Sequence, residues 1–196
     1  MKKIIPKDAV LLPDKAKRVF KGEIFDVYQW PQPMFDGSTA TFEMLRRPDT
    51  VEAICIVDDK LLLLDDEQPH RGSRLSFPGG RVDEADVDIL SAAKREMLEE
   101  TGYQFKTWKL LLAKQPHTKI EWFIYLFVAS DGQKLAVPRP DAGERISCQA
   151  LAFDDVKELS LGQAGYLGNA QDIFKLAHSI EELAALPEFS GQEVDS

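Results

Sequence analysis

The 196-residue chain has few of the residues that usually form disulfides, metal-thiolate sites or histidine metal sites. It contains only two cysteines and three histidines. Cys55 and Cys148 lie far apart in apolar contexts, so we expect reduced core thiols rather than a disulfide or a metal site. His70, His117 and His178 have no spacing typical of metal ligands, and we expect structural roles for them.

Long apolar runs and an excess of positive charge are also lacking. No apolar run approaches the roughly 20 residues that a membrane-spanning helix needs, and the first residues lack a signal-peptide core. We therefore expect a cytoplasmic protein with no membrane partner. The formal net charge is -9, and a general nucleic-acid binder would need a basic surface, so nucleic acid is not an expected partner. A small phosphorylated ligand held by metal ions and a few local arginines remains compatible with this charge.

Apolar periodicity and turn signals predict a mixed α/β fold with a subdomain boundary near residue 48. Before the boundary we expect strands over 18–30 and 40–45, joined through an Asp-Gly turn. After it we expect strands over 50–57, 60–64, 108–113, 121–129 and 146–153, and helices over 86–102, 154–159 and 169–186. Residues 1–15 are predicted as a loose arm, and 65–76 and 130–143 as irregular. The predicted organisation is an N-terminal strand extension (1–48), a main domain (49–186) and a flexible tail (187–196).

The clearest functional signal is an acidic helix face. Glu96, Glu99 and Glu100 are spaced i, i+3 and i+4, so in a helix their carboxylates project from one side. A divalent cation would relieve their repulsion, and Mg²⁺ commonly takes one or two carboxylates plus substrate phosphates. The triplet alone is equally compatible with a solvated surface on which Arg95 pairs with Glu99. The preceding loop, Pro78-Gly79-Gly80, lets the backbone pass close to another group.

The stretch from Gly80 to Tyr103 resembles the signature of the Nudix hydrolases. That signature is Gly, five residues, Glu, seven residues, and then Arg-Glu-apolar-X-Glu-Glu-X-Gly-apolar. Arg95 to Tyr103 matches the second half at every fixed position. One residue is inserted in the first half, which displaces the leading Glu. Three acids could replace it: Asp83, Glu84 or Asp86.

The resemblance extends to the ADP-ribose pyrophosphatase branch of that family. The similar stretches are Phe35-Asp36-Gly37 with Phe42-Glu43, Arg47-Pro48, Glu67-Gln68 with Arg71, Asp141-Ala142-Gly143-Glu144, and Gly168-Asn169-Ala170. The implied fold is a Nudix-type α/β/α sandwich with a mixed sheet and an N-terminal antiparallel strand extension. The resemblance also implies a homodimer in which the N-terminal strands reach the partner subunit.

The reaction implied by the resemblance is hydrolysis of the pyrophosphate bond of a nucleoside diphosphate linked to a group X. ADP-ribose or a related nucleotide sugar is the expected small-molecule substrate. Mg²⁺, with Mn²⁺ as a substitute, would neutralise phosphate oxygens and lower the pKa of the attacking water. The expected metal ligands are the Gly79 carbonyl, Glu96, Glu99, Glu100 and Glu144.

The same resemblance assigns catalytic roles to Glu99, Glu100, Glu144 and Arg95. Glu144 would come from a mobile loop and either hold a second metal ion or act as general base, and Arg95 would orient Glu99.

Arginines and aromatic residues are the expected substrate contacts. Arg71 is the first candidate for the diphosphate because a guanidinium can bind phosphate through two hydrogen bonds. Arg74 and Arg47 are further candidates. Three aromatic residues could stack on a nucleobase, although aromatic residues on strands are also ordinary core residues: Tyr28, Trp30 and Phe35.

Two other functions are compatible with these residues. A Nudix-like regulator would bind a nucleotide sugar without cleaving it, but we would expect it to have lost the acidic residues that are intact here. A hydrolase of oxidised nucleoside triphosphates would not need the N-terminal strand extension. The preferred X, the number of metal ions and the general base stay open at this point.

Overall fold

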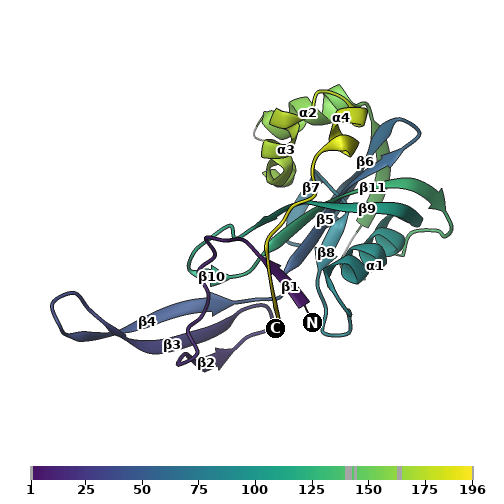
Figure 1. Cartoon of the computed structure of the whole chain (residues 1–196). Coiled ribbons are helices and arrows are strands. Elements are labelled where there is room, and N and C mark those ends of the chain that lie inside the picture. Colours follow the sequence, from purple (N-terminus) through teal and green to yellow (C-terminus); the bar gives the residue numbers. More distant parts are fainter. Residues whose placement is uncertain (1, 140–142, 144, 163–164, 196) are drawn as a thin grey trace.

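A seven-stranded mixed sheet forms the centre of the protein (Figure 1). The computed structural model describes residues 2–139, 143, 145–162 and 165–195. The strands of this sheet are β5 (Thr50–Val57), β6 (Lys60–Gln68), β7 (Arg71–Ser76), β8 (Gly79–Arg81), β9 (Tyr103–Lys114), β11 (Ile124–Lys134) and β12 (Arg145–Leu151). Their order is β12-β6-β5-β11-β9, with β7 paired to β6 and β8 paired to β5. The short β8 therefore places its glycines directly beside the central strand β5.

Helices cover both faces of the sheet, as Figure 1 shows. Helix α1 (Ile89–Thr101) covers one face, and α2 (Phe153–Leu161), a 3-10 turn (Gly165–Ala170), α3 (Gln171–Leu176) and α4 (Ile180–Ala185) cover the other. Side chains of a strand alternate between faces, so Val51 and Ala53 of β5 join the core under α1 while Ile54 joins the core under α2 to α4. The predicted α/β/α sandwich is confirmed.

Local capping fixes the ends of α1. The Asp88 side chain accepts a hydrogen bond from Ser91 N, and the Ser91 hydroxyl accepts one from Asp88 N, which forms a capping box. Gly102 ends the helix with φ 73°, a left-handed conformation that costs glycine little. These caps agree with the predicted start at residue 86 or 88 and the predicted end at Gly102.

Some strand boundaries differ from the prediction. The strand expected over 18–30 is split into β2 (Lys17–Lys21) and β3 (Asp26–Pro33). Gly22 N donates to Phe25 O at 3.1 Å, and a Cβ at position 22 would lie 2.5 Å from that oxygen, so the glycine permits a tight reversal. The stretch expected to be irregular over 65–76 instead contains the end of β6 and all of β7.

The two ends of the chain pair with each other. β1 (Lys2–Ile5) is antiparallel to β13 (Gln192–Asp195), so Lys2 lies opposite Asp195. Lys3 Nζ also lies 2.9 Å from the buried Asp49 carboxylate. The predicted loose arm and flexible tail therefore both contain a strand, because each supplies the partner that the other lacks.

A second, four-stranded sheet forms the N-terminal extension. Its order is β10-β4-β3-β2, with β4 (Thr39–Arg46) and the main-domain segment β10 (Ile120–Glu121) running parallel. Arg46 anchors the extension through an ion pair of 2.6 Å with Glu121. The β3–β4 hairpin projects away from the body of the molecule (Figure 1).

Cysteine placement follows the prediction in one case and not in the other. Cys55 is fully buried, and its thiol lies 3.4 Å from Met97 Sδ. Cys148 is exposed on β12, an edge strand, so the expectation of a core thiol is wrong at that position. Both cysteines are free thiols.

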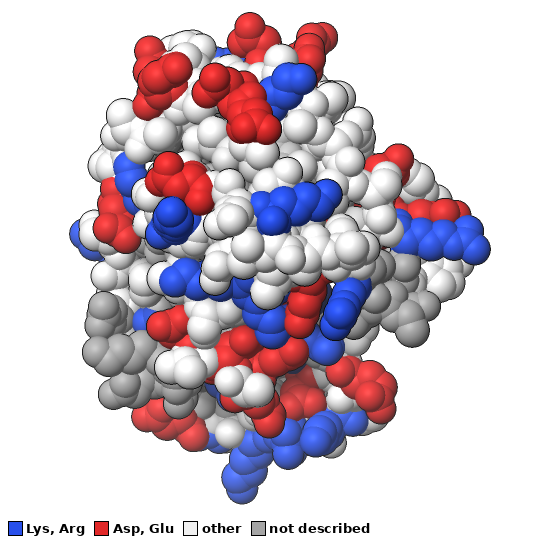
Figure 2. Space-filling view, turned by 90° about the vertical axis from the view of Figure 1, so that its right-hand side faces the viewer, with Lys and Arg blue, Asp and Glu red and all other residues white. Residues whose placement is uncertain are grey.

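The outer surface carries charges of both signs. On the face seen in Figure 2, acidic and basic side chains are interspersed, and a small group of basic side chains lies along the lower edge. Among the helices that the structure describes, none is long and apolar enough to cross a membrane.

Candidate active site

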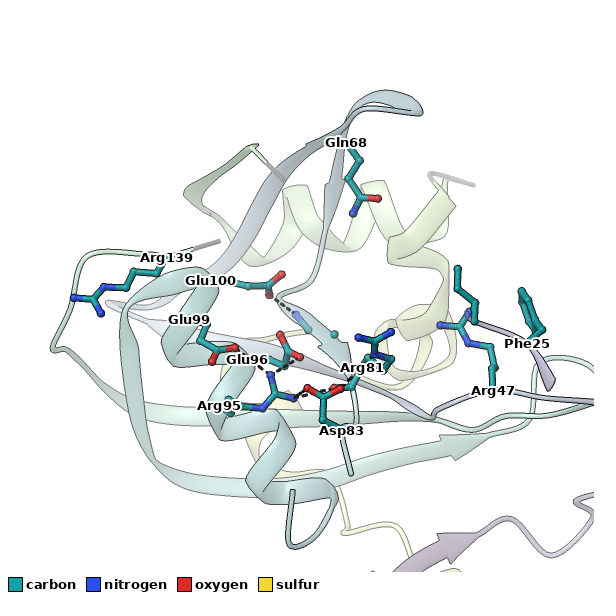
Figure 3. Close-up of a pocket in the computed structure, with 13 residues that line it drawn as sticks. Phe25, Arg47, Gln68, Arg81, Asp83, Arg95, Glu96, Glu99, Glu100 and Arg139 are labelled. Atoms are coloured by element: carbon teal, nitrogen blue, oxygen red, sulfur yellow. Dashed lines mark hydrogen bonds and ion pairs between the residues drawn. The ribbon is translucent and has the colours of Figure 1, made fainter. Parts of the chain in front are cut away.

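A cavity of about 620 Å³ lies where α1, the glycine loop and the N-terminal extension meet (Figure 3). Its lining residues are Ile24, Phe25, Arg47, Gln68, Gly79, Gly80, Arg81, Asp83, Arg95, Glu96, Glu99, Glu100 and Arg139. Carboxylates gather at one end, and Arg81, Arg47 and Phe25 follow toward the other end. The cavity therefore has an acidic end, a basic middle and an apolar end.

The carboxylate of Glu96 is packed against Gly80. A Cβ at position 80 would lie 2.5 Å from the Glu96 carboxyl carbon, so only glycine leaves room for this acid. Burial raises the pKa of Glu96 to about 7, although the charge of Arg95 and its hydrogen bond act in the opposite direction. A buried acid with this pKa gains stability in its charged form when a cation approaches.

Glu100 holds the other glycine of the loop. Its Oε2 accepts a hydrogen bond of 2.7 Å from Gly79 N, and the residue is 9% exposed. Gly79 itself runs close to β5, since a Cβ there would lie 2.1 Å from Val51 O. Glu96 and Glu100, one turn apart on α1, thus each contact one glycine of β8.

Arg95 links the start of α1 to its acidic face. Its Nε and one terminal nitrogen bind both oxygens of Asp86 at 3.1 and 3.0 Å. Its other terminal nitrogen contacts Glu96 at 2.9 Å and Glu99 at 3.1 Å. The hydrogen bond from Arg95 lowers the pKa of Asp86, and the same bond raises the pKa of Arg95.

These contacts distinguish among the three acids that could replace the displaced Glu of the signature. Asp86 alone binds Arg95 through two hydrogen bonds. Asp83 lies 3.6 Å from Arg95 and contacts Arg81 instead, while Glu84 is exposed. Of the three acids, Asp86 therefore makes the most extensive contact with Arg95, although its side chain is shorter than that of glutamate.

The model of the NUDIX domain family matches residues 46–169. The chain belongs to the Nudix family. Among solved structures, it is similar to a crystal structure of an ADP compounds hydrolase, with 20% sequence identity and a TM-score of 0.64. That similarity covers 82% of this chain and 91% of the other, and it shows a shared fold. Comparison with curated protein sequences gives no significant match. The resemblance to the Nudix hydrolases seen in the sequence is confirmed.

Nudix enzymes generally use divalent metal ions, and the acidic end of the cavity offers the type of ligand atom that such ions bind. Glu96, Glu99 and Glu100 offer carboxylate oxygens, which hard cations prefer. The close packing of Glu96 on Gly80 leaves that carboxylate buried, and burial raises its pKa, so a divalent cation beside it would stabilise its charged form. Within the described residues, no three His, Cys, Asp or Glu side chains are close enough to form a complete metal site by themselves. Glu144, the remaining predicted ligand, lies outside the described residues.

The predicted substrate contacts are only partly brought to the cavity. Arg47 lines it, whereas Arg74 lies on β7 and is not among the lining residues. The side chain of Arg71 lies outside the described part of the chain.

The three predicted aromatic residues lie on the N-terminal extension, away from this cavity. Tyr28 stacks under Arg46, with the guanidinium 4.9 Å from the ring centre. Trp30 is buried within the extension, 6.1 Å from the ring of Phe42. Phe35 is fully exposed at the tip of the β3–β4 hairpin. None of the three lines the cavity of its own chain, and their contact with substrate stays a prediction.

Four residues that line the cavity were not predicted as site residues from the sequence. Phe25 and Ile24 reach the cavity from the reversal between β2 and β3, which the pattern of a continuous strand concealed. Arg81 follows the paired glycines directly, and that position could have indicated it. Arg139 lies near the acidic face because its N donates to Glu99 O at 2.7 Å.

A buried acid lies on the opposite side of β5 from α1. Glu52 is paired with Gly79 across the β5–β8 ladder and accepts a hydrogen bond of 2.7 Å from Asn169 Nδ2. Burial raises the pKa of Glu52 to about 7, while the bond from Asn169 and the charge of Lys114 lower it. The bond connects the C-terminal helical layer to the strand that supports the glycine loop.

Replacing Glu52 is expected to change how stability depends on pH. The pKa of Glu52 is higher in the folded state than the ordinary value of 4.5, so its stabilising contribution is complete below pH 4.5 and is lost as pH rises through 7. Glu52→Gln keeps an oxygen for Asn169 and cannot ionise. Relative to wild type, the variant should gain up to roughly 3 kcal/mol of unfolding free energy between pH 5 and pH 8. Urea unfolding at both pH values measures this, and a pH-independent difference would contradict it.

Proposed function

We propose that this Nudix protein hydrolyses the pyrophosphate bond of a nucleoside diphosphate linked to X, with Mg²⁺ as the metal ion. ADP-ribose or a related nucleotide sugar is the proposed substrate, and a nucleoside monophosphate and a sugar phosphate are the products. The observation that carries the proposal is the acidic end of the cavity, where Glu96 and Glu100 each contact one glycine of the loop. The similarity in fold to an ADP compounds hydrolase supports it.

The residues of the chain have separate tasks in this reaction. Glu96, Glu99 and Glu100 would hold the metal, with the Gly79 carbonyl as a further ligand. Mg²⁺, when bound, would neutralise phosphate oxygens and lower the pKa of the attacking water. Arg95 keeps Glu96 and Glu99 oriented and ties them to Asp86. We assign proton transfer from the water to Glu144, a residue outside the described part of the chain.

The gradient along the cavity suggests how the substrate lies. The diphosphate belongs at the acidic end, because the carboxylates there would hold the metal ion that binds the phosphate oxygens. Phe25 and Ile24 offer an apolar surface at the other end, and an aromatic ring can stack on a nucleobase. The nucleoside would therefore extend past Arg81 and Arg47 toward Phe25.

A hydrolysis screen tests the function. With Mg²⁺, ADP-ribose should give AMP and ribose 5-phosphate, and EDTA should abolish the reaction. The panel should include other nucleotide sugars, dinucleotides and 8-oxo-dGTP. Preference for 8-oxo-dGTP would support the nucleoside triphosphate alternative, and tight binding without any turnover would support the regulatory one. Either result would overturn our proposal.

We also propose a homodimer that forms through the N-terminal extension. In the part of that extension from β2 to β4, six large apolar side chains are exposed: Val19, Phe20, Ile24, Phe25, Met34 and Phe35. Several large exposed apolar side chains on one small sheet are typical of an interaction site. In a dimer, the projecting hairpin would carry Tyr28, Trp30 and Phe35 toward the partner. There they would contact the substrate in the partner's cavity.

Charged residues on this surface should therefore separate the subunits. The double variant Phe20→Glu, Phe35→Glu should shift a dimer to a monomer in sedimentation velocity, because both side chains are exposed and neither belongs to the buried core. Leu176→Glu, at a residue that is 65% exposed on α3, is the matched control and should remain dimeric. A monomeric wild type, or a dimeric double variant, would contradict the proposed interface.

A further inference from the structure

Two arginines in the middle of the cavity face each other without enough negative charge to balance them. Arg47 and Arg81 both line the cavity. Burial lowers the pKa of Arg47, and the nearby positive charge of Arg81 lowers it further. In Figure 3, Arg81 lies between the acidic end and Arg47, and Phe25 lies beyond Arg47.

Arg47 is held in place mainly by aromatic contacts. Its guanidinium lies 4.6 Å from the centre of the Trp122 ring and 5.6 Å from that of Phe25. Its Nε is buried, and no hydrogen-bond acceptor for it is found among the described residues. Cation–π contacts orient a guanidinium but leave its hydrogen-bond donors unused. A planar, fixed donor set of this kind suits a phosphate.

Arg81 is only partly neutralised. Its Nε lies 3.3 Å from an Asp83 oxygen, which leaves the terminal nitrogens with no acceptor in the described part of the structure. Asp83 is in turn within 3.6 Å of Arg95, so its charge is shared. The charge of Asp49 also acts on Arg47, but Asp49 is itself paired with Lys3 at 2.9 Å. Two adjacent guanidinium groups whose nearest carboxylates are each shared with another cation attract an anion.

We infer that the Arg47–Arg81 pair is a binding site for a phosphate group on the ribose of the nucleoside half of the substrate. The inference rests on the proposed function, which places the diphosphate at the acidic end and the base on Phe25. The ribose then lies beside the two arginines, at the position where a 2′- or 3′-phosphate would meet both. Arginine serves the same purpose in nucleotide sites that accept a ribose 2′-phosphate. The preferred substrates are therefore nucleoside diphosphate compounds with a third phosphate on the ribose.

Matched pairs of substrates test the inference directly. The pairs are ADP-ribose with its 2′-phosphate, NADH with NADPH, and dephospho-coenzyme A with coenzyme A. Wild type should show kcat/KM at least about 10-fold higher for the phosphorylated member of one or more pairs, since a charge-assisted hydrogen bond to an arginine supplies a factor of this size. Arg81→Met and Arg47→Met should each remove most of that ratio, by lowering kcat/KM for the phosphorylated member more than for the other. Arg139→Met, which removes a cavity arginine at the acidic end, should leave the ratio unchanged.

Equilibrium binding separates failure of this inference from failure of the proposed function. By calorimetry without divalent metal, adenosine 2′,5′-bisphosphate or adenosine 3′,5′-bisphosphate should bind at least about 10-fold tighter than AMP, and Arg81→Met should remove the difference. Hydrolysis of both members of every pair at equal rates would overturn the ribose-phosphate site and leave the proposed function standing. If Arg81→Met and Arg47→Met lower kcat/KM equally for both members of a substrate pair, the two arginines hold the diphosphate itself, and the ribose-phosphate site is overturned. If none of the pairs is hydrolysed, the proposed function fails, and equal binding of AMP and the bisphosphates would then overturn the site as well.

Discussion

The variant Glu100→Gln is expected to lower kcat by about 1,000-fold or more while the protein stays folded. Glutamine has nearly the same shape, and its amide oxygen can still accept the hydrogen bond from Gly79 N that Glu100 accepts at 2.7 Å. The negative charge is lost, however, and a neutral amide is a much weaker ligand for a hard cation. Steady-state kinetics across Mg²⁺ concentrations should show lower kcat together with a higher Mg²⁺ requirement.

A matched control is available for this variant. Glu158→Gln makes the same chemical change on α2, outside the cavity, and should have wild-type kinetics. Circular dichroism and the midpoint of thermal unfolding should be similar for all three proteins. Near wild-type turnover by Glu100→Gln would remove the assignment of Glu100 as a metal ligand.

The second large effect is expected from adding one methyl group to the glycine loop. In Gly80→Ala the new Cβ would lie 2.5 Å from the Glu96 carboxyl carbon, closer than two such atoms can approach. Because the obstacle is the end of a flexible side chain, Glu96 can rotate away at little cost in stability. The metal site would lose a ligand, and we expect kcat/KM to fall about 100-fold with only a small change in the thermal midpoint.

Two further variants make this prediction specific. Gly72→Ala is the matched control, because a Cβ at position 72 meets no atom within 4 Å, and its activity should stay near wild type. Glu96→Asp shortens the acid, so the double variant Gly80→Ala, Glu96→Asp should recover part of the activity that Gly80→Ala loses. A fully active Gly80→Ala protein would show that Glu96 does not need its position against the loop.

The features found from the sequence are those that depend on neighbouring residues. Helix α1 is one example: its start at Asp88, its end at Gly102 and its acidic face all follow from local spacing and capping. The paired glycines predicted a close approach of the backbone to another group, and the structure shows that the group at Gly80 is the Glu96 carboxylate. Asp86 could not be chosen over Asp83 and Glu84, since the choice depends on which carboxylate reaches both nitrogens of Arg95.

The features that the sequence did not reveal depend on distant segments. Phe25 is brought to the cavity by a reversal at Gly22 inside an otherwise continuous strand pattern. The proximity of Arg47 and Arg81 requires β8 to pair with β5, and short strands such as β8 have too few residues to show a period. Where a side chain such as Phe35 points depends on the path of the whole hairpin.

The pairing of the two chain ends has a consequence for how the protein folds and opens. β1 and β13 are the segments farthest apart in sequence, so their contact closes the longest loop in the molecule and costs the most chain entropy. We therefore expect this contact to form after the rest of the domain and to open first. Opening would separate Lys3 from Asp49 and leave a buried carboxylate that still accepts a hydrogen bond from Phe123 N. The paired ends should therefore open while the rest of the domain stays folded. Amide hydrogens of residues 2–5 should exchange with solvent well before those of β5.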